Sequence, residues 1–232
     1  MIDLALHHPQ VRCVQSFHEL VSTPLHGDKN AICWSRQLVG DFSEIINKVA
    51  FEGNMTTLDE ESLMALSLSK QGTLAREILI HDLNLLKSIG AAPVLNIIKS
   101  YDRDDSTSFF PTDVYSFHVD QAPVPVDTFL CTYYGNASEI LPNEQGIQKI
   151  LVPEIRSQLK EIYGGSEYGF ESFLSDYFYD LHYQAKSDAQ PFSLGKGHLW
   201  KIATAYPNSA VMPCIHRAPI EGENQKRLLI IC

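Results

Sequence analysis

The chain has 232 residues, of which 44% are hydrophobic and 20% are charged, and this composition is typical of a globular protein with a substantial core. Its formal net charge of −10 argues against a nucleic-acid groove, because phosphate contacts require clustered lysine and arginine side chains. An anionic small molecule is compatible with this charge, since one arginine in a closed site can pair with a carboxylate.

The N-terminal stretch and the cysteines predict the cellular compartment. MIDLALHHPQVRC has neither the basic region nor the apolar run of a secretory signal, and no segment approaches the roughly 18 apolar residues of a membrane span. The cysteines are odd in number and lack CxxC spacing, which favours reduced, buried thiols over disulfides or a zinc site; they are Cys13, Cys33, Cys131, Cys214 and Cys232. We expect a cytoplasmic protein without a membrane partner.

Helices are expected to dominate residues 1–92, as a layer that supports the rest of a single domain spanning residues 1–232. The segment DFSEIINKVAF, residues 41–51, begins with an aspartate in the N-cap position. The segment TLAREILIHDLNLLKSIG, residues 73–90, carries apolar residues at helical spacing before a terminal glycine. His81 lies inside this second helix and is expected to be an ordinary helix residue.

From residue 93 to residue 232, short β-branched and aromatic runs predict an antiparallel barrel or sandwich. The runs are PVLNIIKSY, DVYSFHV, DTFLCTYY, HLWKIATAY, SAVMPCIH and KRLLIIC. The polar run YDRDDSTSFFPTD, residues 101–113, separates the first two and is expected to form a solvated loop or, alternatively, a lid.

Two helical stretches interrupt the predicted strands and form an insert at about 147–184. IQKILVPEIRSQLKEIYG, residues 147–164, has helical periodicity, although Pro153 is expected to weaken or kink it. FESFLSDYFYDLHYQ, residues 170–184, has the same periodicity and places His182 on an amphipathic helix. The insert would either cap the barrel or form a subunit interface.

His118 and Asp120 lie two residues apart in the strand-like run SFHVDQ. Side chains at positions i and i+2 of a strand project to the same face, so this pair can bind one metal ion. His216 ends the later run SAVMPCIH and completes a facial triad of two histidines and one carboxylate, the set that holds Fe(II) in non-haem oxygenases. Such a triad leaves the dication a net positive charge, which attracts an anionic bidentate ligand. Alternatively, the histidines are ordinary, partly buried residues of a sheet.

Arg227 opens the last predicted strand, eleven residues after His216. A hairpin through PIEGENQ would return its strand beside His216 and point the guanidinium into the same cavity. A guanidinium pairs with a carboxylate through two hydrogen bonds, which suits the far end of a dicarboxylate such as 2-oxoglutarate. Thr132 and Tyr134 share a face in FLCTYY, and one of them is expected to hydrogen-bond a bound oxo-acid; alternatively, both only pack the sheet.

Arg217 and His198 compete with Arg227 and His216 for these roles. Arg217 follows His216 directly and should point away from the metal, so we expect a structural salt bridge; a bulge would make it the alternative anchor. His198, in SLGKGHLWKI, could replace His216 as a ligand, but only His216 precedes the arginine-bearing strand. SLGKG is expected to be a turn, because it lacks the GxxxxGK[ST] order and leads into a strand.

The order H-x-D, then a distant histidine and an arginine, resembles the Fe(II)/2-oxoglutarate-dependent dioxygenases. That resemblance implies a double-stranded β-helix of the cupin or jelly-roll kind. The stretches NAICWSRQLVGDFSEII, FHVDQAPVPVDTFLCTYYGNASEILPN and CIHRAPIEGENQKRLLI also resemble the bacterial family of unknown function DUF1826, over most of the chain. FHVD, LCTYYG and HRAP carry this resemblance, whereas NASEILPN departs from the tryptophan-containing turn of the family.

The residues and the resemblance together predict an α+β protein, a double-stranded β-helix with an N-terminal helical layer, that binds Fe(II) through His118, Asp120 and His216. 2-Oxoglutarate would bind at the metal and to Arg227, and a small-molecule or peptide substrate would be hydroxylated or demethylated. No catalytic side chain is predicted beyond the metal ligands. Two alternatives stay open: a cupin-like metal-binding protein or oxygenase that does not use 2-oxoglutarate, and a non-catalytic barrel scaffold.

Overall fold

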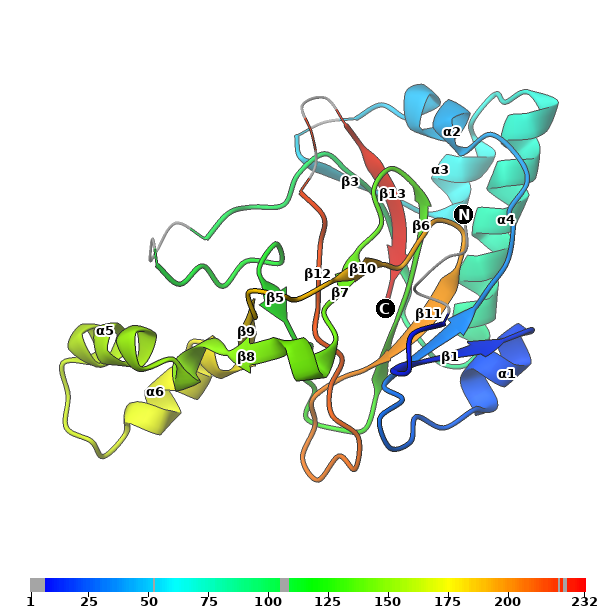
Figure 1. Ribbon diagram of the computed structural model, residues 1–232. Coiled ribbons are helices and arrows are strands. Elements are labelled where there is room, and N and C mark those ends of the chain that lie inside the picture. The colour runs from blue at the N-terminus through cyan, green and yellow to red at the C-terminus, as the bar shows by residue number, and fades with distance from the viewer. Residues whose placement is uncertain (1–6, 52, 105–108, 221, 223–224) are drawn as a thin grey trace.

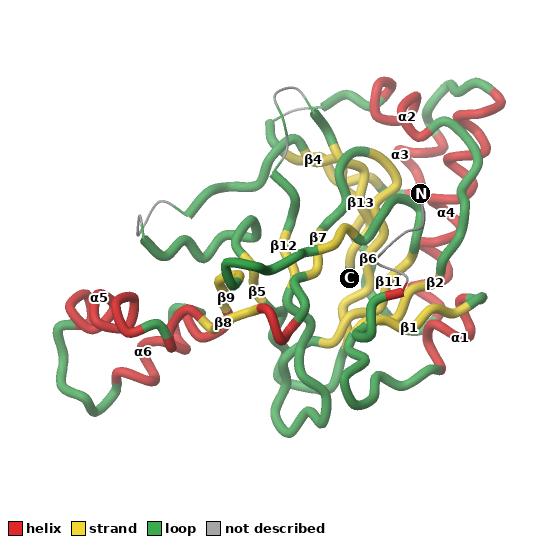
Figure 2. Tube along the Cα trace, viewed as in Figure 1, coloured by secondary structure: helices red, strands yellow, loops and turns green. Residues whose placement is uncertain are grey.

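The structure, a computed structural model, describes residues 7–51, 53–104, 109–220, 222 and 225–232. Two β-sheets and a layer of helices make up a mixed α+β architecture, and one of the sheets curls into a half-barrel (Figure 1, Figure 2). Within the described ranges, no helix combines the length and the apolar character that crossing a bilayer requires.

Seven strands form the larger sheet, in the order β1-β2-β11-β6-β13-β4-β3. Their bounds are Val11–Val14 (β1), Ala31–Trp34 (β2), Met55–Leu58 (β3), Val94–Ile98 (β4), Asp127–Tyr134 (β6), Leu199–Ala203 (β11) and Arg227–Ile231 (β13). Only β1 and β2 pair in parallel, and the other neighbours are antiparallel. The C-terminal strand β13 lies between β6 and β4, so the end of the chain is tied into the middle of the sheet.

Six short strands form the smaller sheet, in the order β10-β7-β12-β5-β9-β8, and all neighbours are antiparallel. Their bounds are Phe117–His118 (β5), Glu139–Ile140 (β7), Gly146–Gln148 (β8), His182–Ala185 (β9), Phe192–Ser193 (β10) and His216–Arg217 (β12). From β4 to β7, and again from β10 to β13, each successive strand belongs to the other sheet. The chain therefore crosses repeatedly between two layers.

Four helices cover the outer face of the larger sheet (Figure 1). They are α1 (Phe17–Ser22), α2 (Phe42–Lys48), α3 (Glu60–Met64) and α4 (Lys70–Ser88). Their apolar residues and alternate residues of the sheet form one core cluster, which includes Leu79, Leu83, Ile97, Leu228 and Ile230. As predicted, the carboxylate of Asp41 caps α2 by accepting hydrogen bonds from the backbone of its first turn.

The inner face of the larger sheet packs against the smaller sheet. Leu130, Trp200 and Leu229 of the larger sheet share a buried cluster with Ile140 of β7 and with Cys214, which precedes β12. A fully buried leucine or isoleucine contributes about 1.5–3 kcal/mol to stability, so apolar contact holds the two layers together. Because side chains alternate along a strand, this cluster also identifies the other residues that face inward.

The insert between β7 and β10 lies at the edge of the smaller sheet, away from the helical layer (Figure 1). It contains α5 (Pro153–Tyr163) and α6 (Phe170–Asp176), and its ends contribute β8 and β9 to the sheet. Its aromatic residues Phe170, Phe173 and Tyr179 form a small core together with Phe110, which comes from the loop before β5. The insert is therefore partly helical and partly an extension of the sheet.

Two predictions for this insert are wrong. Pro153 begins α5 at its first position, where a missing N–H group costs nothing, so it does not kink a longer helix. The second helix ends at Asp176, and His182 belongs to β9 instead of a helix. Phe178 adopts a left-handed conformation with φ of 59°, which turns the chain out of the helical path between them.

The first 92 residues contain three strands in addition to the predicted helices. Strands β1 and β2 extend the larger sheet beyond β11, and β3 extends it beyond β4. Each of the three is four residues long, which is too short to show a period in the sequence. Among residues 101–113, the described ones contain no helix or strand, in agreement with the predicted loop; residues 105–108, on which a lid would depend, lie outside the described residues.

All five cysteines are free thiols, as predicted. Cys33, Cys131 and Cys214 are buried, whereas Cys13 is exposed and Cys232 is half-buried. Burial, the largest cause, raises the pKa of Cys131 to about 12, so this thiol stays protonated at neutral pH. The predicted burial thus holds for three of the five.

A buried ion pair fastens α4 to the larger sheet. The guanidinium of Arg36 pairs with both carboxylate oxygens of Asp82, and its Nε donates to the carbonyl of Gly197 at 2.7 Å. Tyr133 of β6 donates its hydroxyl to the same carboxylate at 2.6 Å. Because Asp82 is fully buried, the loss of a partner leaves a charge in the interior without compensation.

We predict that Asp82→Ala lowers the free energy of unfolding by about 3–5 kcal/mol, because it leaves the Arg36 charge unpaired in the interior. Tyr133→Phe removes one hydrogen bond to a charged group and should cost less, about 1.5–3 kcal/mol. Urea unfolding measures both, and the exposed Asp188→Ala should change stability by at most about 0.5 kcal/mol. Equal stabilities for Asp82→Ala and the wild type would show that the ion pair does not hold α4.

Candidate metal centre

The register of the smaller sheet aligns three histidines. His216, which begins β12, lies directly opposite His118 of β5, and His118 lies directly opposite His182 of β9. Directly paired residues share a face of the sheet. The centroid of the His118 ring is 4.6 Å from that of the His216 ring and 5.8 Å from that of the His182 ring. Ile140, the partner of His216 on β7, belongs to the cluster between the sheets, so this row faces the larger sheet.

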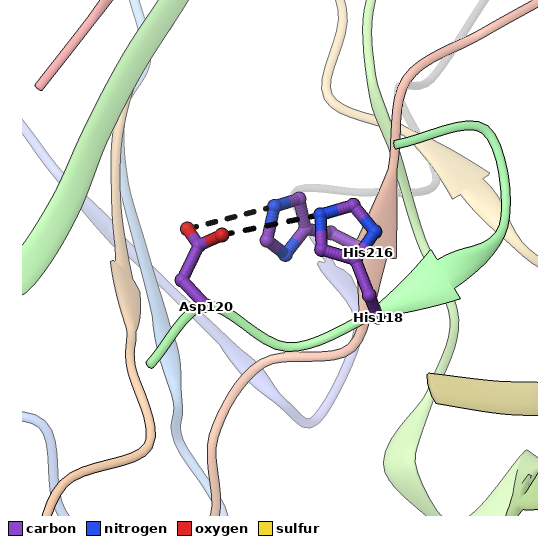
Figure 3. Close-up of side chains that lie close together, drawn as sticks. All are labelled: His118, Asp120 and His216. Carbon is purple, nitrogen blue, oxygen red and sulfur yellow. Dashed lines mark ion pairs between the residues drawn. The ribbon is translucent and has the colours of Figure 1, made fainter. Parts of the chain in front are cut away.

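Asp120 follows β5 and completes the predicted triad (Figure 3). One of its carboxylate oxygens lies 3.9 Å from Nε2 of His118, and the other lies 3.7 Å from Nε2 of His216. One ligand atom from each residue falls within 4.8 Å of the other two, so the three could hold one metal ion. Atoms about 2.1 Å from a shared ion lie about 3 Å apart, which requires only a small contraction of the triad.

Backbone carbonyl groups fix the orientation of both imidazoles. Nδ1 of His118 lies 2.8 Å from the carbonyl oxygen of Ser116, and Nδ1 of His216 lies 3.2 Å from that of Cys214. A carbonyl oxygen only accepts hydrogen bonds, so each Nδ1 carries the proton. Each Nε2 therefore lies on the side of Asp120, which makes this nitrogen the donor atom that each imidazole can offer to a metal.

The protonation states of the triad suit a cation. Burial and the charge of His216 lower the pKa of His118 to about 4, so this imidazole is neutral at pH 7. Burial alone would raise the pKa of Asp120, but His216 and the hydroxyl of Thr128, which donates at 2.6 Å, hold that pKa below its ordinary value. A neutral imidazole beside an ionised carboxylate is the charge state that binds a dication.

The triad is closed on the histidine side and open at the carboxylate. The side chain of Asp120 is 33% exposed, whereas those of His118 and His216 are 14% and 8% exposed. Thr128, which holds Asp120, belongs to β6, so both sheets position the ligands. Two imidazoles and one carboxylate on one face of an ion leave further positions for other ligands.

Arg227 begins β13 on the face that looks toward the smaller sheet. It pairs with Ile98 and precedes Leu229 by two residues, and both of these belong to the cluster between the sheets. The side chain of Arg227 is buried, and its Nη2 donates to the hydroxyl of Ser138 at 3.2 Å. The guanidinium therefore points inward, but β13 lies in the larger sheet between β6 and β4 and not beside β12, so the predicted hairpin that would place the Arg227 strand next to the His216 strand is wrong.

Ser138 connects Arg227 to the triad. It precedes Ile140 by two residues, and Ile140 lies directly opposite His216. Two residues of a strand span about 7 Å and paired residues are about 5 Å apart, which puts Ser138 roughly 9 Å from His216. A buried cation and a candidate metal site thus lie in neighbouring parts of one space between the sheets.

A β-bulge separates Thr132 from Tyr134, which were predicted to share a face. Leu229 of β13 pairs with Thr132, but the residue before it, Leu228, pairs with Tyr134. Tyr133 is therefore an extra residue in β6. Thr132 is buried and faces inward with Leu229. Tyr134 is 40% exposed and lines a surface cavity of about 410 Å³ together with residues of α2 and two residues before β13, Gln225 and Lys226. The prediction that the two residues share a face is therefore wrong. Tyr134 points away from the space between the sheets, and contact of Thr132 with a bound oxo-acid stays a prediction.

Arg217 and His198 lie away from the triad. Arg217 pairs with Glu139 of the neighbouring strand at 2.7 Å and stacks on Phe117, so the predicted structural salt bridge is confirmed. Nδ1 of His198 accepts the backbone N–H of Arg36 at 3.2 Å. Among the described residues, the metal-holding group contains His216 and not His198, in agreement with the choice made from chain order.

His182 is the residue of this site that sequence reasoning missed. Its Nδ1 lies 3.0 Å from the hydroxyl of Ser116, the residue whose carbonyl orients His118. Burial and the charge of His118 lower the pKa of His182 to about 3, so it is neutral at pH 7. The available signal was the aromatic run YFYDLHYQ, which favours a strand as much as a helix. His182 thus supports the ligand row without belonging to the triad.

Comparisons with known proteins assign this chain to no family. The chain matches no family model, no curated protein and no solved structure. The resemblance to DUF1826 and to the dioxygenases therefore stays a prediction, and the geometry of the site carries the functional inference.

We predict that the purified protein binds one Mn(II) ion per chain and that His118→Ala abolishes this binding, because two donors remain from a set of three. Thr128→Val should weaken the affinity by about 10–100-fold, because it releases Asp120 and keeps all three ligands. Titration followed by electron paramagnetic resonance measures free Mn(II). His198→Ala is the matched control and should bind like the wild type. Normal Mn(II) binding by His118→Ala would remove the triad from consideration.

Proposed function

We propose that the protein is an Fe(II)/2-oxoglutarate-dependent dioxygenase that hydroxylates or demethylates its substrate. The observation that carries this proposal is the common inward direction of the triad on one sheet and of Arg227 on the other. A facial triad alone is compatible with any small metalloprotein. A buried guanidinium near it fits a ligand that chelates a metal at one end and carries a carboxylate at the other.

The strand order supports a double-stranded β-helix as the core. Eight strands make up this core, and we number them one to eight in chain order: β4, β5, β6, β7, β10, β11, β12 and β13. In these numbers the larger sheet has the order 1-8-3-6 and the smaller sheet has the order 2-7-4-5. These are the orders that a jelly roll produces, because its strands alternate between two sheets. Strands β1, β2 and β3 then extend the first sheet, and β8 and β9 extend the second.

The triad would hold the iron in a fixed orientation. Nε2 of His118, Nε2 of His216 and the carboxylate of Asp120 are the donors, and their hydrogen bonds keep them directed at one point. Bound iron and 2-oxoglutarate supply the oxidation of a substrate C–H bond by O2. The residues of the chain contribute the orientation of the donors and, at His118, an imidazole that is neutral at pH 7.

Arg227 would bind the distal carboxylate of 2-oxoglutarate. Its guanidinium is shielded from water, which strengthens a charge-assisted hydrogen bond. The hydroxyl of Ser138 orients one of its nitrogens at 3.2 Å. Thr132 faces the same space, because it pairs with Leu229, two residues after Arg227, and offers a second donor to the carboxylate.

We predict that Arg227→Leu weakens 2-oxoglutarate binding by about tenfold to a hundredfold, because it removes a charge-assisted pair worth about 1.5–3 kcal/mol. Calorimetry on the Mn(II)-loaded protein measures the affinity, and the Mn(II) stoichiometry should stay at the wild-type value. Arg217→Leu is the matched control, since its guanidinium already pairs with Glu139, and it should bind 2-oxoglutarate like the wild type.

Two outcomes would contradict the proposal in different ways. A wild-type protein that binds Mn(II) without binding 2-oxoglutarate would exclude the co-substrate and favour a cupin-like metal-binding protein. Loss of 2-oxoglutarate binding in Arg217→Leu alone would keep the co-substrate and assign its anchor to the other arginine.

A further inference from the structure

A cavity of about 640 Å³ opens beside the candidate metal ligand Asp120. Its walls come from the loop after β5, from the start of β6, from residues 89–92 after α4 and from the C-terminal Cys232. Asp120 is the most exposed member of the triad and the one that lines this cavity. A molecule in the cavity would therefore reach the open side of the metal centre.

The walls of this cavity combine apolar, neutral polar and negatively charged side chains, and the neutral polar ones are Gln121, Thr128 and Thr204. Ala91, Ala122, Val126 and Phe129 contribute hydrocarbon surface. Its charged lining residues are Asp120 and Asp127, and no lysine, arginine or histidine lines it within the described part of the chain. A bound metal ion would neutralise the charge of Asp120. Asp127 would then be the negatively charged side chain that faces a substrate.

Asp127 lacks a close partner for its charge. Among the residues that the structure describes, none forms a hydrogen bond or an ion pair with its carboxylate. Burial raises the pKa of Asp127. The charge of Lys201 acts on Asp127 and lowers its pKa, but the ammonium of Lys201 donates to the carbonyl oxygens of Thr23 at 2.6 Å and Val21 at 3.4 Å. A half-buried carboxylate in this situation is stabilised by an added cation.

We propose that this cavity is the substrate site and that it takes an alkylammonium group. The ammonium pairs with Asp127, and the alkyl chain packs on Val126 and Phe129 with a carbon directed toward Asp120. A carboxylate or phosphate at the same place would meet Asp127 as a like charge and would have no basic side chain to bind it. The reaction of such a substrate rests on the proposed dioxygenase function, whereas the preference of the cavity for a cation does not.

The test uses three probes of equal length: n-butylammonium, n-butanol and butyrate. Ligand-observed proton NMR on the Mn(II)-loaded protein reports binding, and Mn(II) broadens the probe protons that lie near the metal. Butylammonium should bind at least about tenfold more tightly than butyrate, because only the cation gains a charge-assisted pair. Its protons should be broadened in the wild type.

Two variants locate the binding, each with a matched control. Asp127→Asn should weaken butylammonium binding by about tenfold and leave butanol binding unchanged, while the exposed Asp188→Asn should change neither. Val126→Trp should block the cavity, whereas Val124→Trp alters the same exposed loop outside the cavity and should bind normally.

The two proposals fail separately. If Mn(II) does not bind, the metal centre is wrong, and saturation transfer on the metal-free protein still tests whether butylammonium binding depends on Asp127. Butyrate binding as tight as that of butylammonium, unchanged butylammonium binding in both Asp127→Asn and Val126→Trp, or no binding of any probe would overturn the alkylammonium site.

Discussion

The candidate site depends on the register between two very short strands, β5 and β12. His118 and His216 meet because they are direct partners in this pair, and a slip of one residue would turn one imidazole to the opposite face. The pair is too short to hold its own register, so the neighbouring elements must fix it. Phe117, Val119, Leu141 and Ile215 form a buried cluster of the smaller sheet, and this packing opposes a slip. The geometry of the candidate metal centre is therefore set by an apolar cluster.

The flanking strands add polar contacts that reinforce the same register. The ion pair between Arg217 and Glu139 joins β12 to β7, and the backbone N–H of Val119 donates to the carbonyl of Leu181 at 3.0 Å next to β9. A salt bridge half-exposed to water is worth little by itself, about 0–1 kcal/mol, but it is satisfied in only one register. Its role here is specificity of pairing more than stability.

The groups of the candidate site come from both sheets. The histidines come from the smaller sheet, whereas Thr128 and Arg227 come from the larger sheet. The apolar cluster between the sheets fixes the distance between these groups, and the ion pair of Arg36 with Asp82 holds the larger sheet against α4. A ligand that touches both sheets would therefore bind to a site formed before it arrives, at a small cost in ordering.

The sequence predicted the residues whose positions follow from alternation along one strand. The two-residue step from His118 to Asp120 is of this kind. Arg227 does face inward, but from a strand of the other sheet, because its strand does not return beside His216 as the predicted hairpin requires. The direction of Tyr134 was predicted wrongly because a bulge at Tyr133 reverses the alternation of side chains along β6. No residue type in DTFLCTYY indicates an extra residue.

His182 and the strands before residue 92 were missed for a different reason. Helical periodicity extends over the aromatic run that precedes His182, and the turn that ends the helix depends on the left-handed conformation of Phe178, which no glycine announces. Strands β1 and β3 form the two edges of the larger sheet and β2 lies between β1 and β11, so pairing with neighbouring strands, and not local sequence, determines them.

The central claim, that His118, Asp120 and His216 bind one metal ion, is tested most directly by X-ray absorption at the manganese edge of the Mn(II)-loaded protein. The triad predicts a first shell of nitrogen and oxygen atoms with the outer-shell scattering of two imidazole rings, and it predicts that His216→Ala, like His118→Ala, binds no Mn(II). A shell of oxygen atoms alone, or one that contains sulfur, would contradict it.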